Sequence, residues 1–138
     1  MDKKITVNSY SKYRLERSKQ EYEVAKLLYR ENQFLAANNR AYYSIFYAIK
    51  AVLSLERKDF KRHKDVLAYF NKEYIHTEIF PRKIGRKISQ AKSTREDSDY
   101  DEEYQPSSEI TALQIETAKE LIELVEKYLA QFDKKGKT

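Results

Sequence analysis

Residues 38–55 read NNRAYYSIFYAIKAVLSL, and this stretch decides the fold class. Apolar side chains recur in it three and four residues apart, the spacing of one buried helix face; they are Ala41, Ile45, Ala48, Val52 and Leu55. Arg40, Ser44 and Tyr47 follow the same spacing, so they share another face of the helix, about 10 Å long at ~1.5 Å per residue. Two interpretations stay open: these three side chains form a functional site, or Arg40 stands at a helix edge among aromatic core residues.

The same periodicity predicts four further helices on either side of this one. The central helix is expected at about 33–55. The other four are expected from Asn8 or Ser9 to about residue 32, from 61 to 75 with Asp59 as cap, from Pro81 onward, and from Ser107 or Ser108 to about 132. Only two glycines and two prolines are present, which favours long helices with short connections. We therefore expect one all-α domain over residues 1–138, an up-and-down bundle of about five helices with its core at 8–132 and a frayed tail at 133–138.

Three short segments resemble blocks of the HEPN family of small prokaryotic helical proteins, in the order in which that family carries them. Residues 39–46, NRAYYSIF, resemble a block of its second helix. Residues 63–67, HKDVL, resemble the start of its third helix, and Arg95 with the DYD of residues 99–101 resembles an element before its last helix. The resemblance covers roughly residues 8–132. It implies a helical bundle, a two-fold homodimer and a minimal nucleotidyltransferase as an antitoxin-type partner.

Ribonucleases of the HEPN family carry an arginine followed, after four to six residues, by a histidine. Counting from Arg40 leads to Tyr47, and the position after Arg40 holds Ala41 instead of a polar residue. Because a phenol has a reference pKa near 10, it is a poor general base at neutral pH. The candidate catalytic residues are Arg40, Tyr47 and His63, with His63 acting only if the third helix covers the Arg40 face. The pattern predicts weak or absent ribonuclease activity and salt-sensitive RNA binding.

Basic residues are concentrated in the first two thirds of the chain. Residues 1–95 hold 22 Lys or Arg against 10 Asp or Glu, whereas residues 96–138 hold 5 against 12. A basic face attracts polyanions, and RNA is the candidate consistent with the resemblance; the alternative is an ordinary solvated helix surface. The candidate RNA-binding residues are Asn39, Tyr43, Ser44, Lys64, Arg82, Lys83, Arg86 and Lys87.

Several classes of site and location are not indicated by this sequence. There is no cysteine, no glycine-rich phosphate loop and no clustered histidine, so we expect no metal and no cofactor. The acidic run 96–103 is expected to be a solvated loop, and the resemblance implies that Asp99 accepts hydrogen bonds and Tyr100 anchors it. The start of the chain lacks the apolar run of a signal peptide, and no stretch is long and apolar enough to span a membrane. These features predict a soluble cytoplasmic protein.

Two classes of function follow from these features. In the first, the chain is the HEPN half of a toxin–antitoxin-like pair, acts on RNA through a cleft centred on Arg40, and is neutralised by its nucleotidyltransferase. In the second, it is a non-catalytic dimeric module that binds RNA or a nucleotide and serves that enzyme. A broad apolar and aromatic surface on the central helix favours a homodimer; its residues are Tyr42, Ile45, Phe46, Ile49, Val52 and Leu53.

Overall fold

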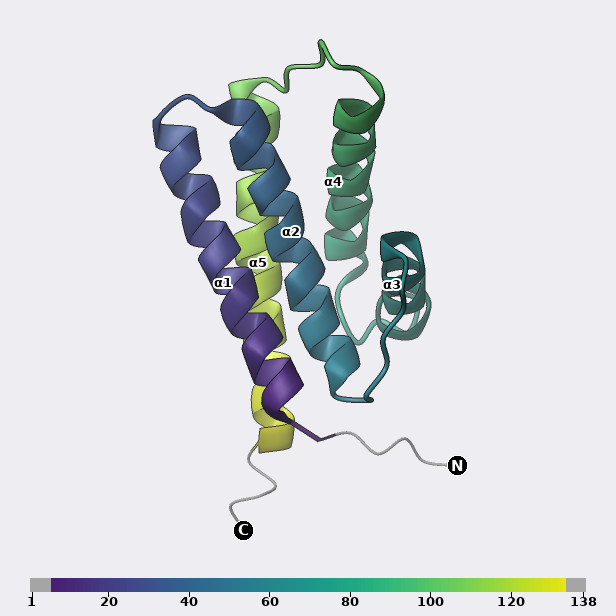
Figure 1. Ribbon diagram of the computed structural model, residues 1–138. Coiled ribbons are helices and arrows are strands. Elements are labelled where there is room, and N and C mark those ends of the chain that lie inside the picture. Colours follow the sequence, from purple (N-terminus) through teal and green to yellow (C-terminus); the bar gives the residue numbers. More distant parts are fainter. Residues whose placement is uncertain (1–5, 134–138) are drawn as a thin grey trace.

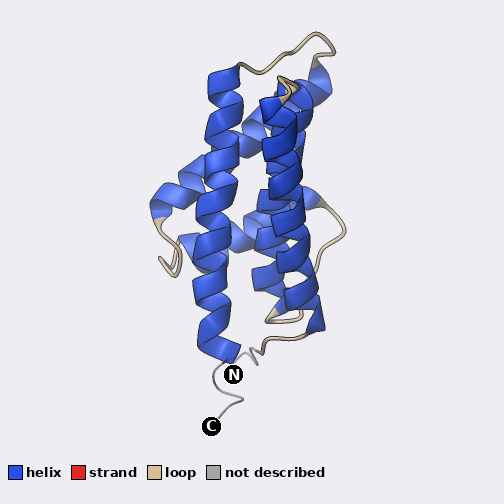
Figure 2. Ribbon diagram, turned by 90° about the vertical axis from the view of Figure 1, so that its left-hand side faces the viewer, coloured by secondary structure: helices blue, strands red, loops and turns tan. Residues whose placement is uncertain are grey.

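The computed structural model describes residues 6–133, and they form an all-α bundle (Figure 1). The helices are α1 (Ser9–Arg30), α2 (Phe34–Ser54), α3 (His63–Phe70), α4 (Arg82–Tyr100) and α5 (Ser108–Asp133), and α3 continues into a π-helical turn, η1 (Asn71–Ile75). Seen from the side of α1, the described residues contain only helices and their connections (Figure 2). The predicted fold class is therefore confirmed. The predicted frayed tail falls largely on residues 134–138, outside the described part.

The centre of the bundle is α2, which contacts α1, α3, α4 and α5. Figure 1 shows α1, α2 and α5 side by side as long helices, with α4 and the shorter α3 on the other side of α2. Ile45, Ile49 and Leu53 of α2 are essentially inaccessible to solvent. Burying an aliphatic side chain of this size contributes about 1.5–3 kcal/mol, so α2 supplies much of the folding free energy.

The proposed dimer surface on α2 is buried inside this chain. Its members, Tyr42, Ile45, Phe46, Ile49, Val52 and Leu53, are each at most 6% exposed. The prediction that these side chains are free to meet a second copy is therefore wrong, because the other helices of the same chain cover them. The homodimer stays a prediction without that support.

Small side chains allow α1 and α2 to approach closely. The Ser18 hydroxyl donates to the Ser44 carbonyl oxygen at 2.6 Å, and the Ser44 hydroxyl donates to the Ser18 carbonyl oxygen at 2.8 Å. Both serines are fully buried, as are Ala37, Ala41 and Ala48 of α2. The pair therefore satisfies its own polar groups at a helix crossing that has no room for larger residues.

Local signals explain where the helices begin and end. Asn8 caps α1 by accepting from the backbone N–H groups of Tyr10 and Ser11, as predicted. The third helix was expected from residue 61 with Asp59 as its cap, but it begins at His63. Asp59 instead pairs with Arg14 at 3.2 Å and Lys50 at 3.3 Å, so its carboxylate is committed elsewhere.

The acidic run was expected to be a loop from residue 96, but α4 continues to Tyr100. Arg95 pairs with Asp99 one turn later, and such a pair supports the helix. Asp99 therefore accepts a hydrogen bond as expected. Tyr100 is 91% exposed, so its expected role as an anchor of the loop is wrong.

A carboxylate at the end of α2 holds α3 and η1 in place. The Tyr69 hydroxyl donates to Glu56 Oε1 at 2.7 Å, and the Tyr74 hydroxyl donates to Glu56 Oε2. Tyr74 is almost fully buried and its ring packs against Phe70, Phe80 and Tyr128. Burial, the hydrogen bond to Glu56 and the charge of that carboxylate all raise the pKa of Tyr74 above its ordinary value.

Candidate functional site

Arg40, Ser44 and Tyr47 share one face of α2, as predicted, and that face meets α1. Arg40 Nη1 lies 3.1 Å from Glu21 Oε1, an almost buried carboxylate, while about half of the Arg40 side chain is exposed. The guanidinium of Arg17 lies 4.9 Å from the Tyr47 ring centre. Glu21 is therefore the polar neighbour that holds Arg40, while the hydroxyl of Ser44 bonds to Ser18.

His63 lies on the opposite side of α2, in a cleft between α2, α3 and α4. We call this hollow of about 210 Å³ the Arg95 cleft. It is lined by Tyr42, Tyr43, His63, Lys64, Leu67, Lys92, Arg95, Glu96 and Asp99. Among the predicted site residues, the structure therefore brings His63, Tyr43 and Lys64 together and leaves Arg40 outside.

The His63 ring is held by aromatic contacts. It stacks on Phe46 with 4.0 Å between ring centres and meets the Tyr43 ring edge to face at 5.9 Å. Partial burial lowers its pKa, and the positive charges of Lys50 and Arg95 lower it further. A lowered pKa keeps the imidazole neutral at pH 7, the state in which it can accept a proton.

Arg95 enters the cleft from the last turns of α4. One of its terminal nitrogens donates to Asp99, and its guanidinium carbon lies 5.9 Å from the Tyr43 ring centre. Burial lowers the pKa of Arg95, but hydrogen bonds to Tyr43 and Asp99 outweigh this effect and raise it. Its Nε atom is buried and has no hydrogen-bond partner among residues 6–133.

The four basic candidates near the start of α4 lie in three different surroundings. Arg82 and Arg86 line a hollow between α4 and η1. Lys87 turns to α5, where its Nζ pairs with Glu120 at 2.8 Å. Lys83 is exposed and lines none of the hollows between α3 and α4. Asn39, also predicted, has an Oδ1 atom that is buried without a hydrogen-bond partner in the described part of the chain.

Reasoning from sequence missed Tyr42, Lys92 and Arg95 as candidate site residues. A signal for the last two was present, because Arg82, Arg86, Ser89, Lys92 and Arg95 recur three or four residues apart. This polar stripe runs beside the apolar stripe of Ile84, Ile88 and Ala91. Helical spacing predicts the stripe, but the side chains that face it come from distant segments of the sequence.

No group of three or more His, Cys, Asp or Glu side chains within residues 6–133 is placed to hold a metal ion. No helix of this range is long and apolar enough to cross a membrane.

Comparison with known proteins places this chain beside a characterised family of domains. A family model described as the HEPN domain matches residues 11–128. A UPF0332 protein of Thermotoga maritima is 30% identical over 110 residues, which cover 80% of this chain and 78% of that relative. Two Methanocaldococcus jannaschii proteins, named "Putative toxin MJ0142" and "Putative toxin MJ0605", are 33% and 28% identical over 87 and 86 residues. Those two matches span 59% and 64% of the relatives, less than two thirds of their length.

Proposed function

Because this chain belongs to the HEPN domain family, we propose that it is a toxin-like member that binds RNA in the Arg95 cleft. The names of the two archaeal relatives support the toxin-like role. The single observation that carries RNA binding is the guanidinium of Arg95, which lines the cleft together with the cations Lys64 and Lys92. Arginine recognises phosphate through donors in a fixed planar fork, so this is the group that a phosphodiester would engage.

The neighbours of Arg95 suit the same ligand. Lys64 and Lys92 add two positive charges to the cleft, and the Tyr43 ring offers a face on which a base can stack. Asp99 occupies one edge of the guanidinium in the free protein. An arriving phosphate would compete with that carboxylate, so Asp99 keeps Arg95 in position at the expense of affinity.

A second candidate function, metal-independent cleavage of RNA, is favoured by the position of His63. Scission of RNA requires a base to activate the ribose 2′-hydroxyl and a cation to stabilise the charge that develops on phosphate. The imidazole of His63, held neutral by its surroundings, is the base in this cleft, and Arg95 supplies the charge. Tyr47 has no part in this scheme, because it lies on the α1 side of α2 under Arg17.

The test is titration of the protein with a short fluorescent RNA of mixed sequence, with cleavage followed in the same samples. We expect Arg95→Gln to weaken binding about tenfold, the loss of ~1.4 kcal/mol typical of one charged contact. Arg40→Gln is the matched control, because it removes the same charge outside the cleft, and it is expected to change affinity by less than about twofold. Cleavage, if detected, should disappear in His63→Gln. Equal losses for the two arginine variants would contradict a site at Arg95.

We also propose that the chain pairs with a minimal nucleotidyltransferase that neutralises it, as the family resemblance implies; the names of two relatives support the toxin-like role alone. The prediction is that induced expression slows growth of a bacterial host and that co-expression of the partner restores it. Arg95→Gln should abolish the growth defect, while Arg40→Gln should keep it. A growth defect that is the same for wild type and Arg95→Gln would show that toxicity does not depend on the Arg95 cleft.

A further inference from the structure

Three hollows run end to end between α3 with η1 on one side and α4 on the other. The widest, about 450 Å³, lies between η1 and the first turns of α4, and a middle one of about 190 Å³ follows it. These two share Asn71, Ile75, Gly85 and Ser89. The middle hollow and the Arg95 cleft share Lys64, Leu67 and Lys92. Hollows that share lining residues lie next to one another, and we call the three together the α3–α4 groove.

The groove exists because the backbone of α4 approaches η1 closely but stays farther from α3. The closest approach is at Gly85, where a Cβ atom would lie only 2.7 Å from Ile75 Cγ2. No real Cβ packs at that distance, so the absence of a side chain at Gly85 allows this contact. Away from this point the two helices separate, and the groove opens toward His76 in one direction and toward Arg95 in the other.

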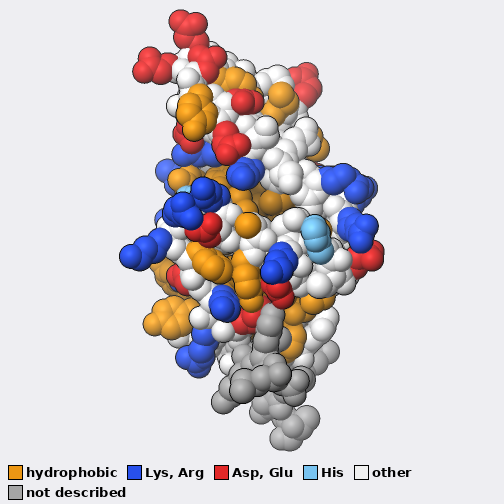
Figure 3. Space-filling model, turned by 90° about the vertical axis from the view of Figure 1, so that its right-hand side faces the viewer, with side chains coloured by type: hydrophobic (Ala, Val, Ile, Leu, Met, Phe, Trp, Pro, Cys, Tyr) orange, Lys and Arg blue, Asp and Glu red, His pale blue; other side chains and the backbone are white. Residues whose placement is uncertain are grey.

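Cations line the α4 wall of the groove along its length. Arg82, Arg86, Lys92 and Arg95 all belong to hollows of the groove, and Ser89 lies among them. From Arg82 to Arg95 the helix rises about 20 Å, at ~1.5 Å per residue. Figure 3 shows this side of the molecule, with Lys and Arg side chains gathered across its middle. The floor of the middle hollow is apolar, formed by Leu67, Phe70 and Ile88.

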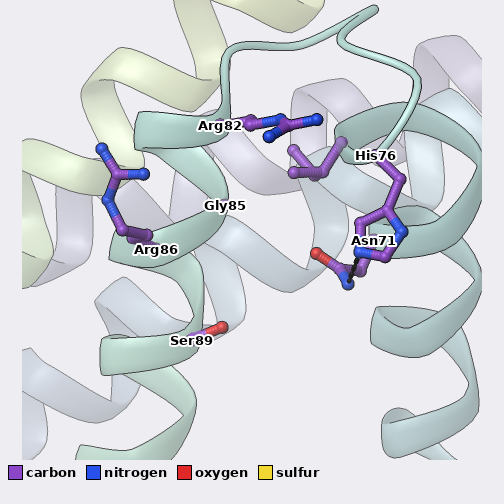
Figure 4. Close-up of a pocket in the computed structure, with 7 residues that line it drawn as sticks. Asn71, His76, Arg82, Gly85, Arg86 and Ser89 are labelled. Carbon is purple, nitrogen blue, oxygen red and sulfur yellow. Dashed lines mark hydrogen bonds between the residues drawn. The ribbon is translucent and has the colours of Figure 1, made fainter.

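The wide end of the groove presents polar groups from both walls (Figure 4). Arg82 reaches from α4 toward His76, while the side chain of Arg86 extends from α4 away from His76. Asn71 Nδ2 and His76 Nε2 lie 3.4 Å apart on the opposite wall. Arg82 has one weak ion pair, 3.8 Å from Glu78, between two exposed side chains. Its charge is therefore available to an anion.

Acidic residues surround the other end of the groove, near Arg95. Glu96 and Asp99 line the Arg95 cleft, and Asp97, Asp101, Glu102 and Glu103 follow at the end of α4. In Figure 3 these negative side chains gather at one end of the molecule, beyond the basic band. A polyanion in the groove is attracted between Arg82 and Arg95 and repelled beyond Arg95. The binding track therefore has a defined length.

We propose that the α3–α4 groove is a track for single-stranded RNA, with the hollow at Arg82 and His76 as a second phosphate subsite, about 20 Å from the first at Arg95. This inference rests on the proposed function of the Arg95 cleft. Hollows of a few hundred Å³ admit single bases and phosphates and exclude a double helix. At the ~3.4 Å axial rise per nucleotide of a stacked strand, the track holds about six nucleotides. Bases lie over the apolar floor, and phosphates follow the cationic wall.

The experiment compares oligouridylates of about three and about nine nucleotides, one shorter and one longer than the track. Wild type should bind the longer strand at least about tenfold more tightly, because only that strand reaches both subsites. Arg82→Gln with Arg86→Gln should remove most of this gain and leave the short strand unaffected. Lys83→Gln with Lys87→Gln is the matched control, since it also neutralises two cations of α4 but outside the groove, and it should preserve the gain. Arg95→Gln should weaken both lengths.

The outcomes distinguish this inference from the proposed function. If both lengths bind with the same affinity in wild type, or the Lys83 and Lys87 double variant matches the Arg82 and Arg86 double variant, the second subsite is overturned while the Arg95 cleft stands. If neither strand binds, both proposals fail together. A self-complementary duplex that binds as tightly as the single strand, at equal salt, would contradict a groove that excludes double helices. For the longer strand only, the Arg82 and Arg86 double variant should also reduce the slope of log affinity against log salt concentration.

Discussion

Replacement of Glu56 by alanine is expected to lower the free energy of unfolding by about 2–4 kcal/mol. This carboxylate accepts hydrogen bonds from Tyr69 and Tyr74, and Tyr74 is buried where water cannot replace the lost partner. Bonds to a charged acceptor are the stronger kind, and an orphaned buried hydroxyl adds its own desolvation cost. Urea unfolding followed by circular dichroism would measure the loss as a lower midpoint.

Tyr74→Phe provides the control for that prediction, because it removes the buried hydroxyl and leaves the carboxylate with Tyr69. It should cost less than Glu56→Ala. The raised pKa of Tyr74 gives a second signature: its stabilisation is complete below the unfolded pKa near 10 and is lost as pH rises further. Wild type should therefore lose stability above about pH 10 more steeply than Tyr74→Phe. Equal midpoints for wild type and Glu56→Ala would show that this cluster contributes nothing.

Replacement of Ser44 by leucine is expected to lower the free energy of unfolding by a similar amount, about 2–4 kcal/mol. The Ser44 and Ser18 oxygens lie 3.3 Å apart at the crossing of α1 and α2, so no space exists for three more carbon atoms. Overpacking of this kind costs about 1–3 kcal/mol, and the lost hydrogen bond adds about 1 kcal/mol. Thermal or urea unfolding of the variant measures the total.

Ser44→Ala separates the two contributions, since it removes the hydroxyl without adding volume. Its cost should be about 1 kcal/mol, because Ser18 still donates to the Ser44 carbonyl oxygen. A leucine variant no less stable than the alanine variant would mean that α1 can move away from α2 at little cost. The difference between the two midpoints therefore reports how tightly this crossing is fixed.

Most of the helices could be predicted from sequence, because periodic apolar positions and caps are local signals. Asn8 capped the first helix as expected, and the stripe of Ile45, Ala48 and Val52 was buried as its spacing required. The acidic run after Arg95 was misjudged, because its residues resemble a loop in composition. The pairing of Arg95 with Asp99 one turn later, also a local signal, favoured the helix that the structure contains.

The location of the cleft could not be predicted in the same way. Spacing correctly placed Arg40, Ser44 and Tyr47 on one face of α2 and set Tyr42 and Phe46 apart from them. Spacing did not reveal that the face with Arg40 meets α1, or that the face with Phe46 meets His63. Those contacts depend on the order in which the helices pack around α2. Arg95 was noticed only through a family resemblance, because its partner Tyr43 is 52 residues away along the chain.

The π-helical turn after α3 has a consequence for how this molecule tolerates insertions and deletions. Its i→i+5 hydrogen bonds enclose one more residue than the i→i+4 bonds of an α-helix. The turn is therefore equivalent to a one-residue insertion in a regular helix. Through it, Tyr74 points to Glu56 while Ile75 meets Gly85. Loss of one residue here would restore a regular helix and rotate everything after it by roughly 100°. Natural length variation should therefore be rare in η1 and common in the connection between α4 and α5, where an extra residue changes no register.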